Sequence, residues 1–180
     1  MNSIFLILRE RLTQAISTYP SFARGQDLIW VISLYVLFTM TLGWRSGFLR
    51  WAPQSQSIIV RVMLTSLIAP AILEELIFRG LLLPYPANSI SLESYIGWAG
   101  FSLGLFIIYH PLNAVTFFPQ ARVVFFNPVF LILAAALGLV CTITYWQTAS
   151  LWIPVIIHWL AVVLWLLCFG GWEKIENRET

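Results

Sequence analysis

Long apolar stretches separated by short polar breaks run along most of this chain. From Met1 to about Phe22, apolar residues recur at helical spacing with charged residues between them, which predicts an amphipathic helix on a membrane surface. Later stretches are long and apolar enough to predict membrane-spanning helices. The pattern predicts an all-α fold, a polytopic membrane helical bundle of about five to six spanning helices with an N-terminal amphipathic interfacial helix. The predicted spans are residues 27–44, 58–83, 94–110, 129–145 and 150–169.

Proline and polar residues predict where these helices end. Residues 84–93 form a turn-rich loop, because neither of its two prolines can continue a helix. Pro111 predicts that the third span ends at His110, since proline disfavours helical geometry at the residue before it. The stretch that follows is broken by further prolines and predicts a re-entrant or interfacial segment. We therefore expect an amphipathic N-terminal segment (1–26), a membrane-embedded domain (27–172) and a polar tail (173–180).

The composition agrees with a membrane protein. Hydrophobic residues make up 59% and charged residues 10% of the 180 residues, with a mean hydropathy of +0.83. These values are far from those of a soluble globular domain, so we expect an integral, multi-pass protein in contact with the lipid bilayer, in the inner membrane if the source is bacterial. The net charge of +2 and the scattered basic residues argue against nucleic acid as a partner. Cys141 and Cys168 lie in apolar runs and are interpreted as small hydrophobic residues.

Three charged residues interrupt the second predicted span, in the sequence LEELIFRG. A charged side chain at the centre of a spanning helix costs about 2.5 to 3.5 kcal/mol, so Glu74, Glu75 and Arg79 need partners. Glu75 and Arg79 are one helical turn apart, which predicts an ion pair on one face. Glu74 points elsewhere and is expected to face a cavity or another polar group.

The two histidines of the chain also lie in predicted membrane segments. His110 ends the third span and His158 lies inside the fifth. Each alone is commonly a structural hydrogen-bonding residue, but together with Glu74 they would form a polar cluster suited to acid–base chemistry on a water molecule. One histidine could then donate a hydrogen bond to an oxyanion. We expect no cofactor; the less favoured alternative is zinc held by these three residues, although the chain contains no HExxH motif.

Three motifs occur in order along the chain. Glu74 to Arg79 matches EExxxR, Phe106 to His110 matches FxxxH, and the sequence SLWIPVIIH ends at His158. In this order they resemble the CAAX prenyl protease and bacteriocin-processing family, the CPBP or Abi proteins, which are glutamic-type intramembrane endopeptidases. The resemblance covers residues 66–165 and leaves the first span and the amphipathic helix outside it.

The resemblance implies a function and a set of site residues. It implies an endopeptidase that hydrolyses a peptide bond of a membrane-associated peptide or protein substrate. Glu74 is expected to activate the water, His110 to share its proton and His158 to contribute to the oxyanion site. Supporting roles are implied for Glu75, Arg79 and Phe106, the last of which is expected to pack against His110.

The third motif departs from the family at one position. The family's third motif usually continues with asparagine or aspartate four residues after the histidine, where this chain has Val162. Asn113, three residues after His110, is a candidate substitute, although an asparagine after His-Pro is more commonly a turn residue. A noncatalytic interpretation therefore stays open, in which the polar cluster serves a binding, immunity or complex-stabilising factor.

Overall fold

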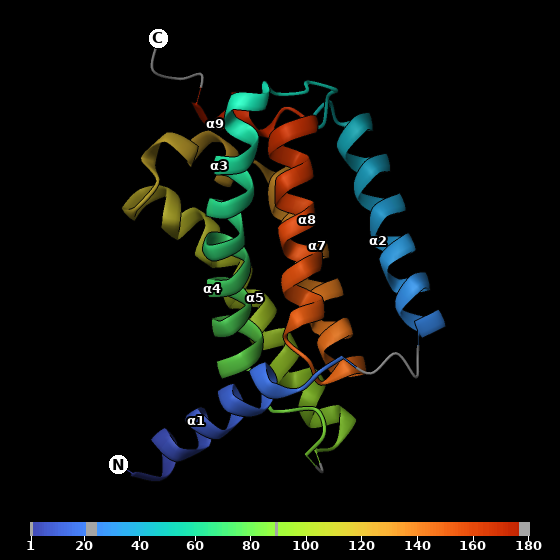
Figure 1. Ribbon diagram of the computed structural model, residues 1–180, viewed down its shortest axis with the longest axis vertical. Helices are drawn as coiled ribbons and strands as arrows, with labels where there is room; N and C mark the ends of the chain where they lie inside the picture. The colour runs from blue at the N-terminus through green and yellow to red at the C-terminus, as the bar shows by residue number, and fades with distance from the viewer. Residues whose placement is uncertain (1, 21–24, 89, 177–180) are drawn as a thin grey trace.

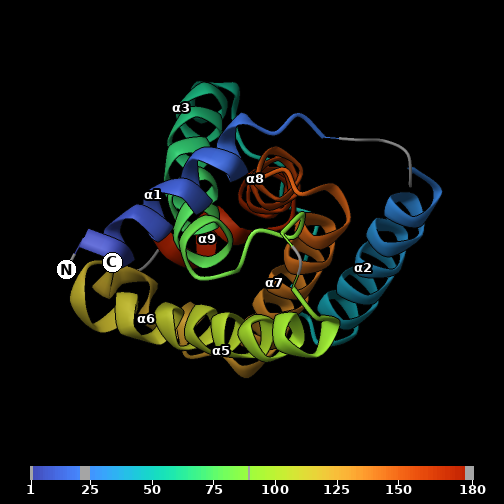
Figure 2. The same ribbon diagram turned by 90° about the horizontal axis from the view of Figure 1, so that it is seen from below.

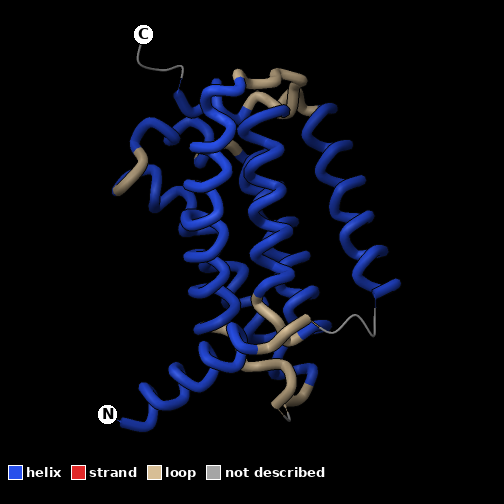
Figure 3. Tube along the Cα trace, in the orientation of Figure 1, coloured by secondary structure: helices blue, strands red, loops and turns tan. Residues whose placement is uncertain are grey.

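The computed structural model describes residues 2–20, 25–88 and 90–176, and over this part of the chain the regular elements are all helices (Figures 1 and 3). Helix α1 (Asn2–Ser17) projects from one end of the bundle, and α2 (Gly25–Arg45) stands along one side. Seen along the bundle, α7 (Pro128–Thr148) and α8 (Trp152–Cys168) lie between α2, α3 (Gln56–Ser66) and α5 (Leu92–Thr116) (Figure 2).

Four helices in the described residues are long and apolar enough to cross a membrane. They are Gly25–Arg45, Gln56–Leu81, Leu92–Thr116 and Pro128–Thr148. The protein is therefore a multi-pass integral membrane protein, as the sequence predicts. The fifth predicted span corresponds to α8, which is apolar but has 17 residues, about 26 Å at the helical rise. The role of α8 as a span and the interfacial position of α1 stay predictions.

The second span is wound unevenly around its charged residues. It passes from α3 into a π-helical stretch, η1 (Leu67–Ile72), a short α4 (Leu73–Glu75) and a second π-helical stretch, η2 (Leu76–Leu81). A kink occurs at Ala69, next to Pro70, which has no backbone N–H to donate. Wide π-helical turns are frequent at functional sites, and here they flank the two glutamates.

The predicted end of the third span at His110 is wrong. Helix α5 continues through Pro111 to Thr116. The proline removes only one backbone donor, a loss that membrane helices tolerate where neighbouring groups compensate. The end of α5 is closed by two backbone N–H groups, of Phe117 and Phe118, which donate to the carbonyl of Asn113 over 2.9 and 2.8 Å. His110 and Asn113 therefore lie on successive turns of one helix, and Asn113 is not a loop residue.

Short helical elements lie at one end of the bundle. After α5 the chain forms η3 (Pro119–Ala121) and α6 (Arg122–Phe125), where an interfacial or re-entrant segment is predicted. At the same end, the loop before α3 runs beside the end of α8, with the Ala52 N–H donating to the Cys168 carbonyl over 2.8 Å. Helix α9 (Gly171–Glu176) follows, so the predicted polar tail begins within a helix; residues 177–180 lie outside the described residues.

The other end of the bundle is tied to α1. The Trp152 indole N–H donates to the Ile16 carbonyl over 2.9 Å, and the Leu151 backbone N–H donates to the Ala15 carbonyl over 3.1 Å. Helix α1 also contacts η2. The start of α8, the helix that carries His158, is thereby fixed to the N-terminal helix.

Candidate active site

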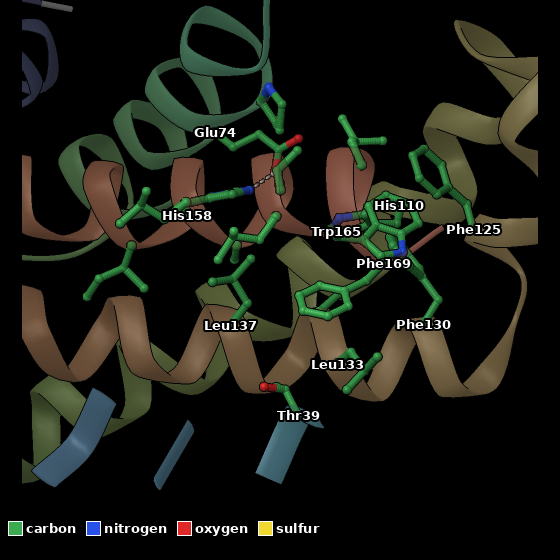
Figure 4. A pocket seen from close by; sticks show the side chains of 18 of the residues that line it. Thr39, Glu74, His110, Phe125, Phe130, Leu133, Leu137, His158, Trp165 and Phe169 are labelled. Atoms are coloured by element: carbon green, nitrogen blue, oxygen red, sulfur yellow. Dashed lines mark ion pairs between the residues drawn. The ribbon is translucent and has the colours of Figure 1, made fainter. Parts of the chain in front are cut away.

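A cavity of about 720 Å³ lies among α2, α5, α7 and α8 (Figure 4). Its walls are mainly apolar side chains, and its size is that of a ligand site. All three residues predicted to be catalytic, Glu74, His110 and His158, line this one cavity although they come from three different helical segments. The structure therefore brings the three residues to one cavity.

The ion pair predicted within the first motif forms beside this cavity. Arg79 Nη1 donates to Glu75 Oε1 over 3.1 Å, and Arg79 Nη2 donates to the Gly138 carbonyl over 2.7 Å. The guanidinium carbon also lies 4.9 Å from the centre of the Phe106 ring. Both charged side chains are almost completely buried, so this helix face is anchored to α5 and α7.

His158 lies between the two glutamates. Its Nδ1 is 2.7 Å from Glu75 Oε1, and its Nε2 is 3.8 Å from Glu74 Oε2. Because an ionised carboxylate only accepts hydrogen bonds, the Nδ1 proton is on His158 and Nε2 faces Glu74. The contact with Glu75 was not predicted, because the two residues are 83 positions apart and no local sequence signal connects them.

Glu74 carries an oxygen without a protein partner. Oε2 is buried and accepts no hydrogen bond from the described residues; Glu75 Oε2 and Arg79 Nε share this property but do not line the cavity. The 3.8 Å separation from His158 Nε2 is too long for a hydrogen bond. The two side chains thus place a carboxylate and an imidazole side by side at the cavity wall.

His110 lies in an aromatic part of the same cavity. Its Nδ1 is 2.9 Å from the Phe106 carbonyl, which only accepts, so Nδ1 carries the proton and Nε2 of the neutral ring is an acceptor. The predicted packing of Phe106 against His110 is confirmed, with ring centres 4.9 Å apart, and Phe125 and Phe130 also contact the imidazole. Among the described residues, no hydrogen bond or ion pair joins His110 to Glu74 or His158.

The geometry does not form the zinc site considered from the sequence. Within the described ranges, no three His, Cys, Asp or Glu side chains are grouped so that they could hold a metal ion. A catalytic zinc needs three protein ligands together, and among the described residues Glu74, His110 and His158 are not grouped in this way. The three residues share a cavity without converging on a single point.

Two further residues of interest line the cavity. Val162 lies one turn after His158 on α8, at the position where the family carries a polar residue. Asn113 lies one turn after His110 on α5 and is buried. Both positions stand out in the sequence, but only the continued helix α5 brings Asn113 into the cavity wall.

These features define a class: a helical membrane protein with a buried acid–imidazole cluster that opens into an apolar cavity. A family model described as type II CAAX prenyl endopeptidase Rce1-like matches residues 55–164, more than half of the chain. The protein belongs to this Rce1-like (CPBP) family, which confirms the resemblance drawn from the three motifs. The matched region contains Glu74, His110 and His158, whereas α1 and α2 lie outside it. No curated protein and no solved structure matches the chain.

Proposed function

We propose that this protein is an intramembrane endopeptidase in which Glu74 activates a water molecule for attack on a peptide bond. The observation that carries the proposal is the position of Glu74 Oε2, which is buried at the cavity wall without a protein partner and lies 3.8 Å from His158 Nε2. Membership of a family of endopeptidases supports it.

The proposed reaction uses the three residues in separate roles. Glu74 takes a proton from the water as its oxygen bonds to the carbonyl carbon, and the carbonyl π electrons move to the oxygen as an oxyanion. His110 shares that proton, because its Nε2 is an acceptor when Nδ1 donates to the Phe106 carbonyl. The proton then passes to the amide nitrogen as the carbon–nitrogen bond breaks and the carbonyl re-forms.

His158 is proposed to contribute positive charge and a hydrogen bond at the oxyanion. When Nε2 carries a proton, the ring is an imidazolium with Glu75 on Nδ1 and the cavity on the other side. Because this donor is already in position, little free energy is needed to reorient it when the oxyanion forms. Glu75 and Arg79 then act as supports, since they hold the imidazole and do not line the cavity.

The proposed substrate is a membrane-associated peptide or protein. Apolar side chains dominate the cavity wall, so an apolar segment fits it better than a charged one. The proposal includes the membrane arrangement: α8 is the fifth span, α1 lies at the bilayer interface, and residues 27–172 are the embedded domain. In support, the exposed residues at the start of α1 include Ile4 and Phe5, which are 68% and 69% exposed.

The test is cleavage of membrane-anchored peptides by the purified protein in detergent. A broad peptide library is incubated with wild type, Glu74→Gln and, as a matched control, Glu93→Gln, an exposed glutamate on α5. Cleavage by wild type and Glu93→Gln but not by a folded Glu74→Gln is expected. Equal cleavage by all three would reject the proposed role of Glu74.

One observation favours a second candidate, a noncatalytic membrane protein that binds a partner or stabilises a complex. Val162 leaves an apolar side chain where the family has a polar one, and the Arg79–Glu75–His158 network forms without Glu74. In that case Glu74→Gln would lose only about 1 kcal/mol of stability, as for one hydrogen bond, and wild type would cleave nothing in the library.

A further inference from the structure

Asn113 presents a carboxamide to the cavity. The residue is only 7% exposed, and no hydrogen bond links its side chain to any described residue. Its backbone carbonyl accepts from Phe117 and Phe118, so the end of α5 is closed without help from the side chain. Thr39, another polar residue of the cavity wall, instead donates its hydroxyl to the Tyr35 carbonyl over 2.8 Å. The amide atoms of Asn113 are not fully buried, so they keep surface at the cavity, where a ligand or water can complete their hydrogen bonds.

Position 162, on the wall formed by α8, lacks such a group, although the Trp165 indole N–H farther along this helix is also buried without a partner. Val162 follows His158 by one turn of α8 and lines the same cavity with an apolar side chain. A neutral His110 presents an acceptor at Nε2, and His158, whose Nδ1–H is used for Glu75, donates to the cavity only when Nε2 is also protonated. An amide has two N–H donors whatever the protonation state of its neighbours.

We infer that Asn113 donates a hydrogen bond to the carbonyl oxygen of the scissile peptide bond and to the oxyanion formed from it. The inference rests on the proposed function, since it assigns a further catalytic residue to that reaction. Residues three apart on a helix have Cβ atoms about 5 to 6 Å apart, so a carbonyl beside His110 is within reach of Asn113. The Asn113 amide on α5 thus supplies the hydrogen bond that a polar side chain at position 162 of α8 would otherwise donate.

The decisive comparison is Asn113→Leu against Gln56→Leu. Gln56 is also a carboxamide, but it is exposed at the start of α3 and does not line the cavity. Loss of one oxyanion donor lowers kcat by about 10² to 10³-fold, so we expect that loss in Asn113→Leu with KM nearly unchanged, and wild-type kinetics in Gln56→Leu. Asn113→Asp, which keeps the shape but removes the donors, serves if the leucine variant does not fold.

A rescue separates this role from a structural one. Val162→Asn is placed in the Asn113→Leu background, where it supplies an amide from the opposite wall. We expect at least a tenfold recovery of kcat, which restored packing alone would not give. An unchanged kcat in folded Asn113→Leu and Asn113→Asp would overturn the inference while leaving the proposed function intact, provided that Glu74→Gln is inactive.

A binding measurement gives a readout that needs no turnover. The affinity of a peptide phosphinate, whose tetrahedral oxygens imitate the oxyanion, is compared with that of the ketomethylene peptide of the same sequence. We expect Asn113→Leu to weaken only the phosphinate, by about 10² to 10³-fold. If wild type cleaves no peptide, or if Glu74→Gln cleaves as wild type does, the proposed function is contradicted. If, in addition, the phosphinate does not bind, or binds Asn113→Leu as tightly as wild type, the inference fails as well.

Discussion

His158 donates a hydrogen bond from Nδ1 to Glu75 Oε1 over 2.7 Å, so the second glutamate of the first motif orients the histidine of the third. The same oxygen accepts from Arg79 Nη1 over 3.1 Å. One carboxylate thus links the charged helix to α8 and leaves Nε2 of the imidazole directed at Glu74. Of the two adjacent glutamates, Glu75 therefore orients His158, and Glu74 faces the cavity.

Replacing the orienting carboxylate should weaken both stability and catalysis. Glu75→Gln removes the negative charge from a buried pair and leaves Arg79 uncompensated, which costs about 3 to 5 kcal/mol in the free energy of unfolding. Unfolding is measured by denaturation in detergent, and kcat and KM on any cleaved peptide. We expect kcat to fall with little change in KM, because the imidazole loses its orientation.

Glu93→Gln is the control for that experiment, because Glu93 is exposed in the first turn of α5. Its effect on unfolding should stay within about 0.5 kcal/mol. Wild-type stability and kcat in Glu75→Gln would show that Glu75 does not support His158.

A close approach of helices makes Gly138 sensitive to substitution. A Cβ at this position would lie 2.7 Å from Leu103 Cδ1, 3.0 Å from Phe106 Cδ1 and 3.2 Å from Arg79 Nη2. Gly138→Ala should therefore lower the free energy of unfolding by about 1 to 3 kcal/mol and reduce kcat, because it displaces Arg79 and Phe106 from their partners.

Gly104→Ala is the matched control on α5, since a Cβ there meets nothing within 4 Å. In a helix this change should be neutral or stabilise by roughly 0.5 to 1 kcal/mol. If Gly138→Ala and Gly104→Ala have the same free energy of unfolding in detergent denaturation, the close approach at Gly138 does not affect stability as proposed.

Metal removal should leave cleavage unaffected. In the described part of the chain no three His, Cys, Asp or Glu side chains are grouped so that they could hold an ion. The measurement is kcat before and after dialysis against a chelator, with metal content determined by mass spectrometry. Stoichiometric zinc, together with activity that is lost on chelation and restored by zinc, would instead support the metal alternative.

The sequence predicted the helices and the identity of the clustered residues better than the contacts among them. Apolar runs of about 20 residues mark spans because unpaired backbone groups are too costly in lipid, and this locates α2, α5 and α7. The spacing of Glu75 and Arg79 predicted their ion pair. Because polar residues are scarce in the predicted spans, the sequence alone indicated Glu74, His110 and His158 as candidate site residues.

Two features depended on tertiary structure. Helix α5 continues beyond Pro111 and ends where the Phe117 and Phe118 N–H groups donate to the Asn113 carbonyl. The local preference of proline does not reveal these contacts. The contact of Glu75 with His158 joins residues 83 positions apart and follows from the packing of α8 against η1 and α7. Local patterns carry no information on such contacts.

The most direct test of the central claim is the turnover number of Glu74→Gln on the best peptide found for wild type, with Glu93→Gln measured alongside. Glutamine keeps the size of the side chain but cannot accept the proton of water. We predict a fall in kcat of at least about 10²-fold for Glu74→Gln, the lower bound for general base catalysis, and wild-type turnover for Glu93→Gln. Wild-type turnover in a folded Glu74→Gln would contradict the account.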